Sequence, residues 1–420
     1  MESSPRLLRP ASPTLGLYLR PGRNDRQDLS QLVAEGDLAV TGLIFDPCLE
    51  NRQHDLMEEA RQRGIEVILD PRTVELSTVG GFSRRGVADL PWALDRPHLP
   101  EDLHHSEGRR LIEELADYAV KHSCSAVLAP SHYVGDLGDP WLTVDRSLTN
   151  LLREALNYRG ANSTLIYYPL IISSALLRSA ETRARLAEVV GPLPVDAIWL
   201  RVHPFGTTQS GPLALCRYID TCRQLHKLPL SLVGERTGTV GLALLAFGAV
   251  GGIESGITVG ERFDVRPYLR PREGNGFLRL PRVYLPDIGA FLEKNVAATF
   301  FDHRGMKSAF ACQSECCRRG VTDMLENPRR HFVTRRSREV AELSRAPVNL
   351  RPGIYMDAFL RPATDLAVRA ARAEPSLERH KRRLDSWRGT LGAQQQEDRL
   401  VRTTHSLVPE GRRIIRRRGA

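Results

Sequence analysis

AVTGLIFDPCLENRQHDLMEEARQRGIEVILDP, residues 39–71, contains one complete strand–helix–strand unit. Its apolar run AVTGLIFDP (39–47) is followed by the amphipathic stretch ENRQHDLMEEARQRG (50–64), which ends on a glycine, as a helix C-cap does. A second apolar run, IEVILDP (65–71), comes directly afterwards. Both runs are apolar on successive residues, which is typical of strands that are covered on both faces of a parallel sheet. The stretch therefore predicts an α/β fold.

The same alternation of strand and helix continues on both sides of this unit. The other strand-like runs are TLGLYLR (14–20), AVLAPSHY (126–133), TLIYYPLII (164–172), DAIWLRVHP (196–204), PLSLVGE (229–235) and VGGIESG (250–256). Eight strands, each followed by a helix, favour a closed (β/α)8 TIM-like barrel over an open sheet. The segment 72–106 is long enough to be an insertion over one face. No G-x-G-x-x-G follows the first strand, which argues against a dinucleotide site.

Composition and order divide the chain into three regions. We expect a (β/α)8 barrel over 14–256, a post-barrel segment with a Cys/His cluster over 257–345, and a basic, partly helical tail over 346–420. The sequence contains no apolar run of about 18 residues, so we expect no membrane span. The N-terminus lacks the apolar core of a signal peptide. Seven cysteines, an odd number, argue against a disulfide scaffold. These features predict a cytoplasmic protein.

Positive charge is concentrated at the C-terminal end. The whole chain carries a net charge of +9, and residues 381–420 alone carry +7, from eleven Lys and Arg and four Asp and Glu. Residues 318–339 contain seven arginines and three acids. This asymmetry favours a polyanion partner, tRNA or DNA, contacted by an appendage of the barrel. A solvated, arginine-rich tail without a ligand fits the same composition equally well, and protein partners or a homo-oligomer also remain open.

Candidate site residues follow from the strand assignment, because active sites of βα barrels are built at the C-terminal ends of the strands. Polar side chains there are rich in acids, arginine, histidine and tyrosine. The residues predicted to bind substrate are Asp46, His132, Tyr133, Arg201, His203, Glu235, Gly251 and Gly252. Asp46 and Asp70 each precede a proline, so a role as turn residues is an equal alternative. Glu235 with Arg236 also fits a surface pair.

Two of these positions have a specific physical argument. Arg201 and His203 are two residues apart in an otherwise apolar strand, so they point to the same side, where an unpaired charge would be costly. Glu254 lies in GGIESG, whose small neighbours allow close approach of a ligand. Paired carboxylates can act as nucleophile and general acid at a glycosidic carbon. No lysine ends a strand, so a Schiff-base aldolase is not expected.

The stretch AFACQSECCRRG (309–320) contains three cysteines. Cys312, Cys316 and Cys317, together with His331, make a Cys3His set that suits a structural zinc ion. Because adjacent cysteines rarely ligate one ion equally, one of Cys316 and Cys317 can be a core thiol, with Glu315, His303 or Asp302 in its place. One alternative is three buried thiols. A redox group is a further alternative, although the sequence here has no C-x-x-C motif.

Several short stretches resemble the tRNA-guanine transglycosylase family and its DNA-modifying relatives. Cys312 and Cys317 match the first and third cysteines of the family's C-x-C-x-x-C zinc pattern, with Ser314 in the second place. Thr78-Val79-Gly80-Gly81-Phe82-Ser83 is similar to the family's D-S-G-G-F-Q, without the acid. Gly251-Gly252-Ile253 and Val259-Gly260-Glu261 are similar to its G-G-L-A-V-G-E, with an insertion between them. The matches run from residue 78 to residue 331.

The resemblance implies a zinc-bearing (β/α)8 barrel that exchanges a guanine for a deazaguanine base in nucleic acid. The nucleophile would be Asp264, in ERFD, or Glu254 in its place; Asp70 is the third catalytic candidate. The zinc module would hold basic residues against the polyanion. These are Arg318, Arg319, Arg329, Arg330, Arg335 and Arg336. The alternatives are a barrel enzyme for a small sugar-like or phosphorylated substrate and a non-enzymatic subunit of a nucleic-acid-associated assembly such as a defence system.

Overall fold

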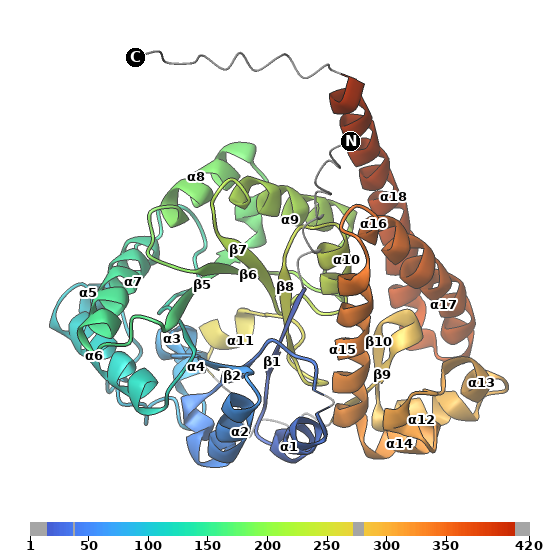
Figure 1. Cartoon of the computed structure of the whole chain (residues 1–420), viewed down its shortest axis with the longest axis horizontal. Helices are drawn as coiled ribbons and strands as arrows, with labels where there is room; N and C mark the ends of the chain where they lie inside the picture. The colour runs from blue at the N-terminus through green and yellow to red at the C-terminus, as the bar shows by residue number, and fades with distance from the viewer. Residues whose placement is uncertain (1–14, 37, 272–280, 408–420) are drawn as a thin grey trace, which may run out of the picture.

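Eight parallel strands close into a barrel in the computed structural model, which describes residues 15–36, 38–271 and 281–407, with side chains up to residue 396 (Figure 1). The strands are β1 (Gly16–Arg20), β2 (Gly42–Phe45), β3 (Glu66–Leu69), β4 (Ala126–Leu128), β5 (Leu165–Ser173), β6 (Ala197–His203), β7 (Ser231–Glu235) and β8 (Gly252–Gly256). β1 pairs with β8, with Gly16 opposite Gly252, and this pairing closes the ring. The predicted (β/α)8 barrel is confirmed, and each predicted run contains one strand.

Helices surround the barrel. Those between the strands are α1 (Arg26–Glu35), α2 (Glu50–Gln62), α6 (Ser106–Lys121), α7 (Trp141–Tyr158), α8 (Ala180–Val190), α9 (Pro212–Leu225) and α10 (Val240–Ala246). The sequence had predicted a helix directly after β8, but in the structure the eighth helix of the ring does not follow β8 directly. Its place is taken by α15 (Pro328–Arg345), which packs against α1, α10 and β1 (Figure 1). The ring of helices therefore includes a segment from beyond residue 256.

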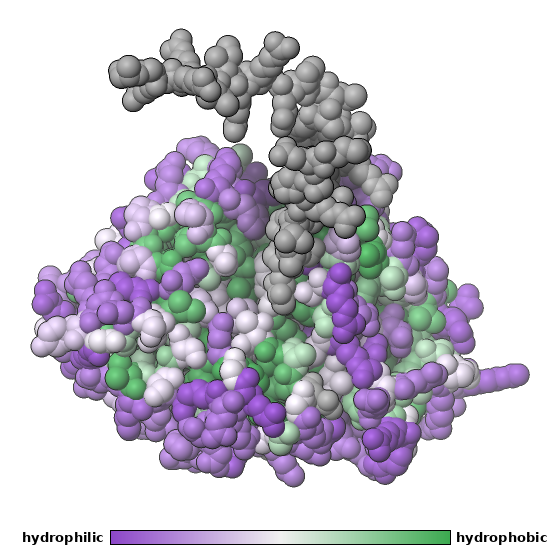
Figure 2. Space-filling view, in the orientation of Figure 1, coloured by the Kyte–Doolittle hydropathy of each residue, from purple (hydrophilic) through white to green (hydrophobic). Residues whose placement is uncertain are grey.

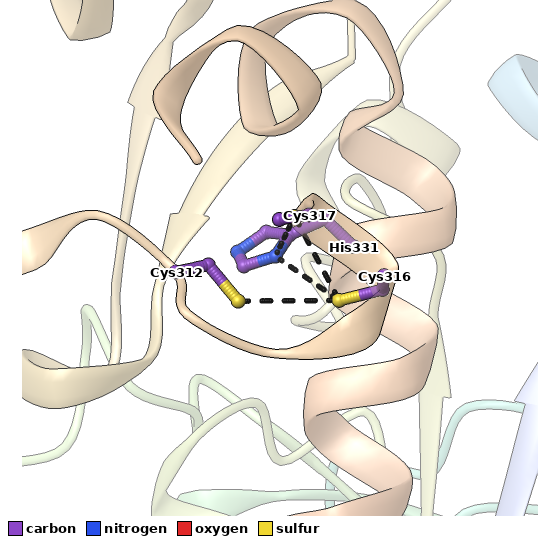
Figure 3. A group of neighbouring side chains, drawn as sticks. All are labelled: Cys312, Cys316, Cys317 and His331. Carbon is purple, nitrogen blue, oxygen red and sulfur yellow. Dashed lines mark hydrogen bonds between the residues drawn. The ribbon is translucent and has the colours of Figure 1, made fainter. Parts of the chain in front are cut away.

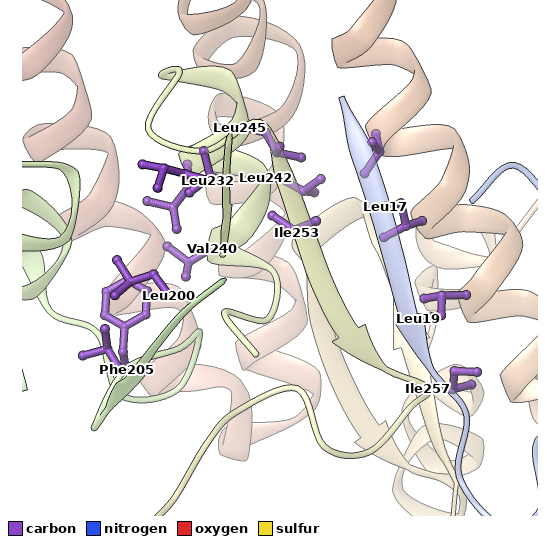
Figure 4. Packing of buried hydrophobic residues seen from close by; sticks show 14 of the residues in the cluster. Leu17, Leu19, Leu200, Phe205, Leu232, Val240, Leu242, Leu245, Ile253 and Ile257 are labelled. Atoms are coloured by element: carbon purple, nitrogen blue, oxygen red, sulfur yellow. The ribbon is translucent and has the colours of Figure 1, made fainter. Parts of the chain in front are cut away.

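Alternation along each strand separates an inner from an outer core. On β1, Leu17 and Leu19 point outward to the surrounding helices, in the same cluster as Ile253 of β8 (Figure 4). Tyr18 points inward, where its ring centroid lies 4.9 Å from that of Trp199. Because side chains alternate with a period of two, the next inward residue after Tyr18 is Arg20. The inner core thus ends in a charged group at the C-terminal end of β1.

Apart from α15, most of the described chain after β8, residues 257–271 and 281–407, packs beside the barrel. Its remaining elements are β9 (Arg282–Leu285), β10 (Ala290–Glu293), α12 (Lys294–Asp302), α13 (Met306–Phe310), α14 (Val321–Glu326), α16 (Arg351–Ile354), the π-helix η5 (Tyr355–Leu360), α17 (Arg361–Ala373) and α18 (Glu378–Leu407). Short 3-10 helices are η1 (Pro47–Leu49), η2 (Ser174–Leu177), η3 (Pro286–Ile288), η4 (Glu315–Cys317) and η6 (Pro375–Leu377). β9 and β10 form an antiparallel pair.

The described C-terminal region packs against the barrel, whereas the sequence predicted a basic appendage that contacts a polyanion. On α15, Arg329 Nε lies 2.7 Å from Asp25 Oδ1 and Arg330 Nη2 lies 2.5 Å from Glu35 Oε2, so α15 is ion-paired to α1 and the residue that precedes it. On α18, the buried indole of Trp387 donates to the carbonyl of Ser210 at 3.1 Å. Residues 408–420 of the predicted basic tail lie outside the described residues.

Three short helices lie at the C-terminal ends of the strands: α3 (Thr73–Leu76), α4 (Val79–Phe82) and α11 (Arg266–Leu269); α5 (Pro100–Leu103) packs against α6 and α7. Gly80 allows α4 to contact α11, because a Cβ there would lie 2.1 Å from the Arg270 carbonyl oxygen. The predicted insertion 72–106 therefore covers the mouth in part. Hydrophilic side chains dominate the edge of the face in Figure 2. Among the described residues, no helix is long and apolar enough to cross a membrane.

Candidate functional site at the barrel mouth

A buried ion-pair network centred on Arg20 occupies the C-terminal ends of the strands. The Arg20 guanidinium is ion-paired with Asp70, donates from Nη2 to Glu235 Oε1 at 2.9 Å, and donates from Nε to Glu254 Oε1 at 3.1 Å. Arg201 on β6 is also paired with Glu235. Four strand ends, β1, β3, β7 and β8, and the inner face of β6 thus meet at one group of charges. Three predicted acids and one predicted arginine belong to it.

The environments of these acids differ. The side chains of Glu235 and Glu254 are 0% exposed. Burial raises the pKa of Glu254, although Arg20 acts in the opposite direction. Burial also acts to raise the pKa of Asp70, but the charges of Arg20 and Arg72 outweigh this effect and lower that pKa below its usual range. Asp70 therefore stays ionised, and Glu254 takes up a proton more readily than an ordinary glutamate.

A second set of charges lies beside the first. Arg72, just after β3, places Nη1 2.7 Å from Asp46 Oδ2 and Nη2 3.0 Å from Glu75 Oε1. Its φ angle is 61°, in the left-handed region. Arg236 (φ 53°) and Thr258 (φ 59°) adopt the same region just after β7 and β8. Backbone strain of this kind is concentrated at functional sites, and here it follows three strands of the same mouth.

Arg20, Arg72 and Glu75 were not among the residues predicted from the sequence. Arg20 is the last residue of the first strand, and an arginine that ends an apolar run was the available signal. Arg72 and Glu75 lie in the loop after Asp70, where neither periodicity nor spacing indicates which side chains turn back to the mouth. The acids and Arg201 were therefore predicted from the strands, whereas Arg20 and Arg72 were missed.

An aromatic and apolar group lies over the network. It consists of Val74, Ile171, Phe263, Val265 and Tyr268, with Tyr133 packed against it. The Arg201 guanidinium carbon lies 5.4 Å from the centre of the Phe263 ring. The His203 ring meets Tyr133 and Phe263 edge-on, with centroids 6.3 Å and 6.2 Å apart. Tyr133 and His203 are thus both at the mouth, as predicted, next to planar rings.

Asp264 lies at the edge of this aromatic group. Its Oδ1 atom is 3.8 Å from Nδ1 of His203, and its Oδ2 atom is 2.5 Å from Nη2 of Arg266. The hydrogen bond from Arg266 lowers the pKa of Asp264 to about 2. The Asp264 side chain is 18% exposed, against 13% for Asp70 and 0% for Glu254. Of the three predicted catalytic acids, Asp264 is therefore ionised and the most accessible.

Three predicted substrate-binding residues have a structural role instead. The imidazole of His132 is 0% exposed, with Nδ1 2.5 Å from Asp145 Oδ1, and its ring stacks on Trp141 at 3.7 Å. Gly251 and Gly252 lie at the N-terminal end of β8, the end of the barrel away from the mouth. A Cβ at Gly252 would lie 3.1 Å from the Tyr18 ring, so close packing explains this glycine. The prediction placed both glycines at the mouth because they belong to the same short motif, GGIESG, as Glu254. The motif spans the whole of β8, and the glycines are at the start of that strand.

The Cys/His cluster forms one compact group beside the barrel (Figure 3). Ligand atoms of Cys312, Cys316, Cys317 and His331 all lie within 4.8 Å of one another. The Sγ–Sγ distances are 3.9 Å (312–316) and 3.7 Å (316–317), and His331 Nδ1 lies 3.3 Å from Cys317 Sγ. Tetrahedral zinc, with Zn–S about 2.3 Å and Zn–N about 2.0–2.1 Å, places its ligand atoms about 3.5–3.8 Å apart. The group can therefore hold a metal ion.

Neighbouring groups orient these four ligands. The Nε2 atom of His331 lies 2.9 Å from the carbonyl oxygen of Tyr284 on β9, so that Nε2 carries the proton and Nδ1 faces the sulfurs. Hydrogen bonding from Cys316, and then from Cys317, lowers the pKa of Cys312, which favours a thiolate. Both adjacent cysteines face the centre. No substitute ligand is needed, and Glu315 points to Arg338 instead, at 3.9 Å.

Most arginines predicted to contact nucleic acid are paired within the protein. Arg329 and Arg330 hold α15 against α1, as described above. Arg336 is 1% exposed, and its Nε atom lies 3.3 Å from Glu339 Oε2. Arg319 is ion-paired with α14, 2.6 Å from an Asp323 oxygen. The prediction was wrong for Arg336, which is a buried residue between α15 and β9.

The other two arginines differ from these. Arg335 is partly buried and donates to the Ser314 hydroxyl at 3.0 Å. Arg318 is exposed and has no ion pair among the described residues. A contact of Arg318 with nucleic acid stays a prediction. Most arginines of the basic stretch 318–339 connect elements of this chain. Sequence composition alone could not distinguish this internal role from a binding surface.

No protein-family model matches this chain, and neither does any curated protein. Solved structures with a similar fold include the endo-1,4-beta-xylanase XylE of Penicillium canescens, 10% identical with a TM-score of 0.39, over 56% of this chain and 81% of the xylanase. Another is orotidine 5'-monophosphate decarboxylase of Methanocaldococcus jannaschii, 12% identical with a TM-score of 0.34, over 60% and 93%. At these values the similarities add nothing to what the strand topology shows.

Proposed function

We propose that this chain is a barrel enzyme that exchanges a guanine-type base in tRNA or DNA, with Asp264 as its nucleophile. The position of Asp264 carries the proposal: it is ionised, partly accessible, 3.8 Å from His203 at the mouth, and next in the chain to Phe263 of the aromatic group. An ionised carboxylate beside planar side chains suits attack on a sugar carbon whose base is held by stacking. The partial resemblance to tRNA-guanine transglycosylases supports the same assignment.

The reaction has two displacements at the anomeric carbon. In the first, a carboxylate oxygen of Asp264 forms a bond to C1′, and the C1′–N9 bond breaks with its electron pair going to the departing guanine, which takes up a proton. In the second, N9 of the incoming base attacks C1′, loses its proton, and releases the Asp264 carboxylate. No oxidant or reductant is required, and two displacements retain the configuration at C1′.

Other residues have supporting roles in this proposal. Tyr133 and His203 position the base by ring contacts. Their own rings already meet edge-on above the Arg20 network. The network itself keeps the mouth rigid, because each of its acids faces an arginine. Zinc is the ion we assign to Cys312, Cys316, Cys317 and His331, since three thiolates and an imidazole are a closed structural set for this metal.

A guanine-exchange assay tests the proposal. Wild-type protein is expected to incorporate labelled guanine into tRNA or DNA, and Asp264→Asn is expected to reduce the rate by at least about 1000-fold, because the amide is not a nucleophile. Asp357→Asn is the matched control, since Asp357 is an ion-paired aspartate on η5, away from the mouth. Denaturing gels of wild type with nucleic acid are expected to show a covalent adduct that Asp264→Asn lacks.

Two outcomes would contradict this proposal. Full activity of Asp264→Asn together with loss of activity in Glu254→Gln would move the nucleophile to β8. Absence of exchange by wild-type protein on both tRNA and DNA would favour one of the other two functions. Of these, an enzyme for a small phosphorylated substrate is favoured by unpaired arginines at the rim, described next, and a non-enzymatic subunit by the ion-paired mouth.

A further inference from the structure

A small pocket lies on the mouth side of the barrel, between the segment after β5 and the first turns of α9. Its volume is about 60 Å³, and its lining residues are Ser174, Leu177, Arg178, Phe205, Ala214 and Arg217. A single water needs about 10–15 Å³ on the same measure. The pocket therefore has room for a group the size of a phosphate.

The pocket is adjacent to the proposed active site. Ser173, the residue before the pocket's serine, is opposite His203 in the pairing of β5 with β6. Phe205 comes two residues after His203 and stacks on Tyr218 of α9, with ring centroids 4.3 Å apart. A ligand in this pocket would thus be held beside the ends of β5 and β6, the strand pair that carries His203.

Unpaired positive charge surrounds this pocket. Among the described residues, neither Arg178 nor Arg217 has a carboxylate partner. Arg262 donates to the Thr208 hydroxyl at 3.0 Å and Arg383 to the Thr208 carbonyl at 2.7 Å, and both bonds are to uncharged groups. At the mouth, in contrast, Arg20, Arg72 and Arg201 each face an acid. Two arginines of the pocket wall and two that contact Thr208, three residues after Phe205, thus have no carboxylate partner among the described residues, and they create a positive potential at this rim.

We propose that this pocket binds a phosphate group, with Arg178 and Arg217 as its cationic donors and Ser174 as a neutral donor. Guanidinium groups match phosphate oxygens in pairs, which is why arginine is preferred for this ligand. The apolar side chains of Leu177, Phe205 and Ala214 form the remaining wall. The phosphate belongs to the nucleic-acid backbone or to a small phosphorylated sugar, and the site does not depend on base exchange.

Calorimetric titration of the full chain with inorganic phosphate, against chloride at equal ionic strength, tests this site. Wild type is expected to bind phosphate, and Arg178→Ala/Arg217→Ala to bind at least tenfold more weakly. Arg178→Lys/Arg217→Lys is expected to give intermediate affinity, because charge remains while paired hydrogen bonds are lost. The control is Arg52→Ala: Arg52 is an exposed arginine on α2 and should leave the affinity unchanged. Equal phosphate affinity in wild type and the double alanine variant would overturn the proposal, as would no binding by wild type.

Two further ligands identify the source of the phosphate. With a single-stranded oligonucleotide, loss of one phosphate contact in the double alanine variant is expected to reduce the slope of log K against log salt by about 0.7. If the phosphate belongs instead to a small phosphorylated sugar, the double alanine variant is expected to bind ribose 5-phosphate about tenfold more weakly, while its oligonucleotide slope stays unchanged. Phosphate binding without guanine exchange would leave this site intact and reject the proposed function alone.

Discussion

Arg20 Nε and Glu254 Oε1 are 3.1 Å apart across the β1–β8 junction that closes the barrel. The first and last strands of the barrel are therefore joined by an ion pair as well as by backbone hydrogen bonds. The same guanidinium neutralises Asp70 and Glu235. This dependence of three buried acids on one cation gives the first prediction.

Arg20→Ala should lower the free energy of unfolding by about 3–5 kcal/mol, because removal of one partner leaves buried carboxylates uncompensated. Urea unfolding measures the loss. Arg26→Ala is the control: its ion pair with Asp55 is on the surface, with side chains 47% and 58% exposed, and should cost less than about 1 kcal/mol. Similar losses in the two variants would show that the network contributes no more than a surface pair.

Cys317→Ser should abolish metal binding, because Cys317 is one of the four grouped ligands and lies 3.3 Å from His331, against 4.0 Å for Cys316. Elemental analysis is expected to give one zinc per wild-type chain and none in the variant, with a fall in thermal stability as α15 loses its link to η4. Cys48→Ser, outside the cluster, should retain the zinc. A wild-type chain purified without metal, and unable to bind added zinc, would leave the four residues as a hydrogen-bonded thiol group.

Arg266→Gln should raise the pKa of Asp264 from about 2 toward the ordinary 3.8, because it removes the hydrogen bond that lowers it. A carboxyl group with a lowered pKa stabilises the folded state above its unfolded pKa and loses that contribution as pH falls through the folded value. Wild type should therefore lose this stability between about pH 4 and pH 2, and the variant should lose less. An NMR titration of the Asp264 carboxyl carbon measures the shift, and identical curves would exclude Arg266 as its cause.

Gly80→Ala should separate α4 from α11, because the new Cβ would lie 2.1 Å from the Arg270 carbonyl oxygen and 2.4 Å from that of Pro267. Overpacking of this kind costs about 1–3 kcal/mol. Gly135→Ala is the matched control, since a Cβ there meets nothing within 4 Å. Hydrogen exchange of residues 73–82 should accelerate in Gly80→Ala only. Protection equal to wild type would show that α4 and α11 accommodate the added methyl group without separating.

Trp387→Ala should cost about 3–5 kcal/mol, as large-to-small changes of buried aromatics do. Trp387→Phe, which keeps most of the volume and removes only the hydrogen bond to Ser210, should cost about 1 kcal/mol. Arg388→Ala, on the exposed neighbour, should be neutral in denaturant unfolding. If Trp387→Ala behaved like Arg388→Ala, α18 would be an independent tail after all.

Local patterns predicted the barrel because each strand is a short apolar run followed by an amphipathic helix, as in 39–71. The same patterns failed at the eighth helix. Nothing local to α15 distinguishes a helix that packs against α1 and α10 from one that projects into solvent, since its arginines suit both. Its true position depends on ion pairs with Asp25 and Glu35, about 300 residues away in the chain.

The site was predictable to a similar extent. Asp70, Glu235 and Glu254 were found because barrel geometry gathers strand ends at one mouth. Arg20 was missed, although it pairs with all of them, and His132 was misassigned because a strand-end histidine can turn outward to an acid on a surrounding helix, here Asp145 of α7. Ligand spacing predicted the Cys/His group but could not show that Cys316 and Cys317 both face its centre, which depends on the 3-10 turn of η4.

The late position of α15 has a consequence for how the chain is made. Ribosomes release the N-terminal end first, at about 5–20 residues per second, so β1 emerges tens of seconds before its neighbours β8 and α15 exist. During that interval the outward side chains Leu17 and Leu19 lack α15, which packs against β1 in the folded chain. The ring of helices can therefore close not at residue 256 but only when residue 345 has left the ribosome.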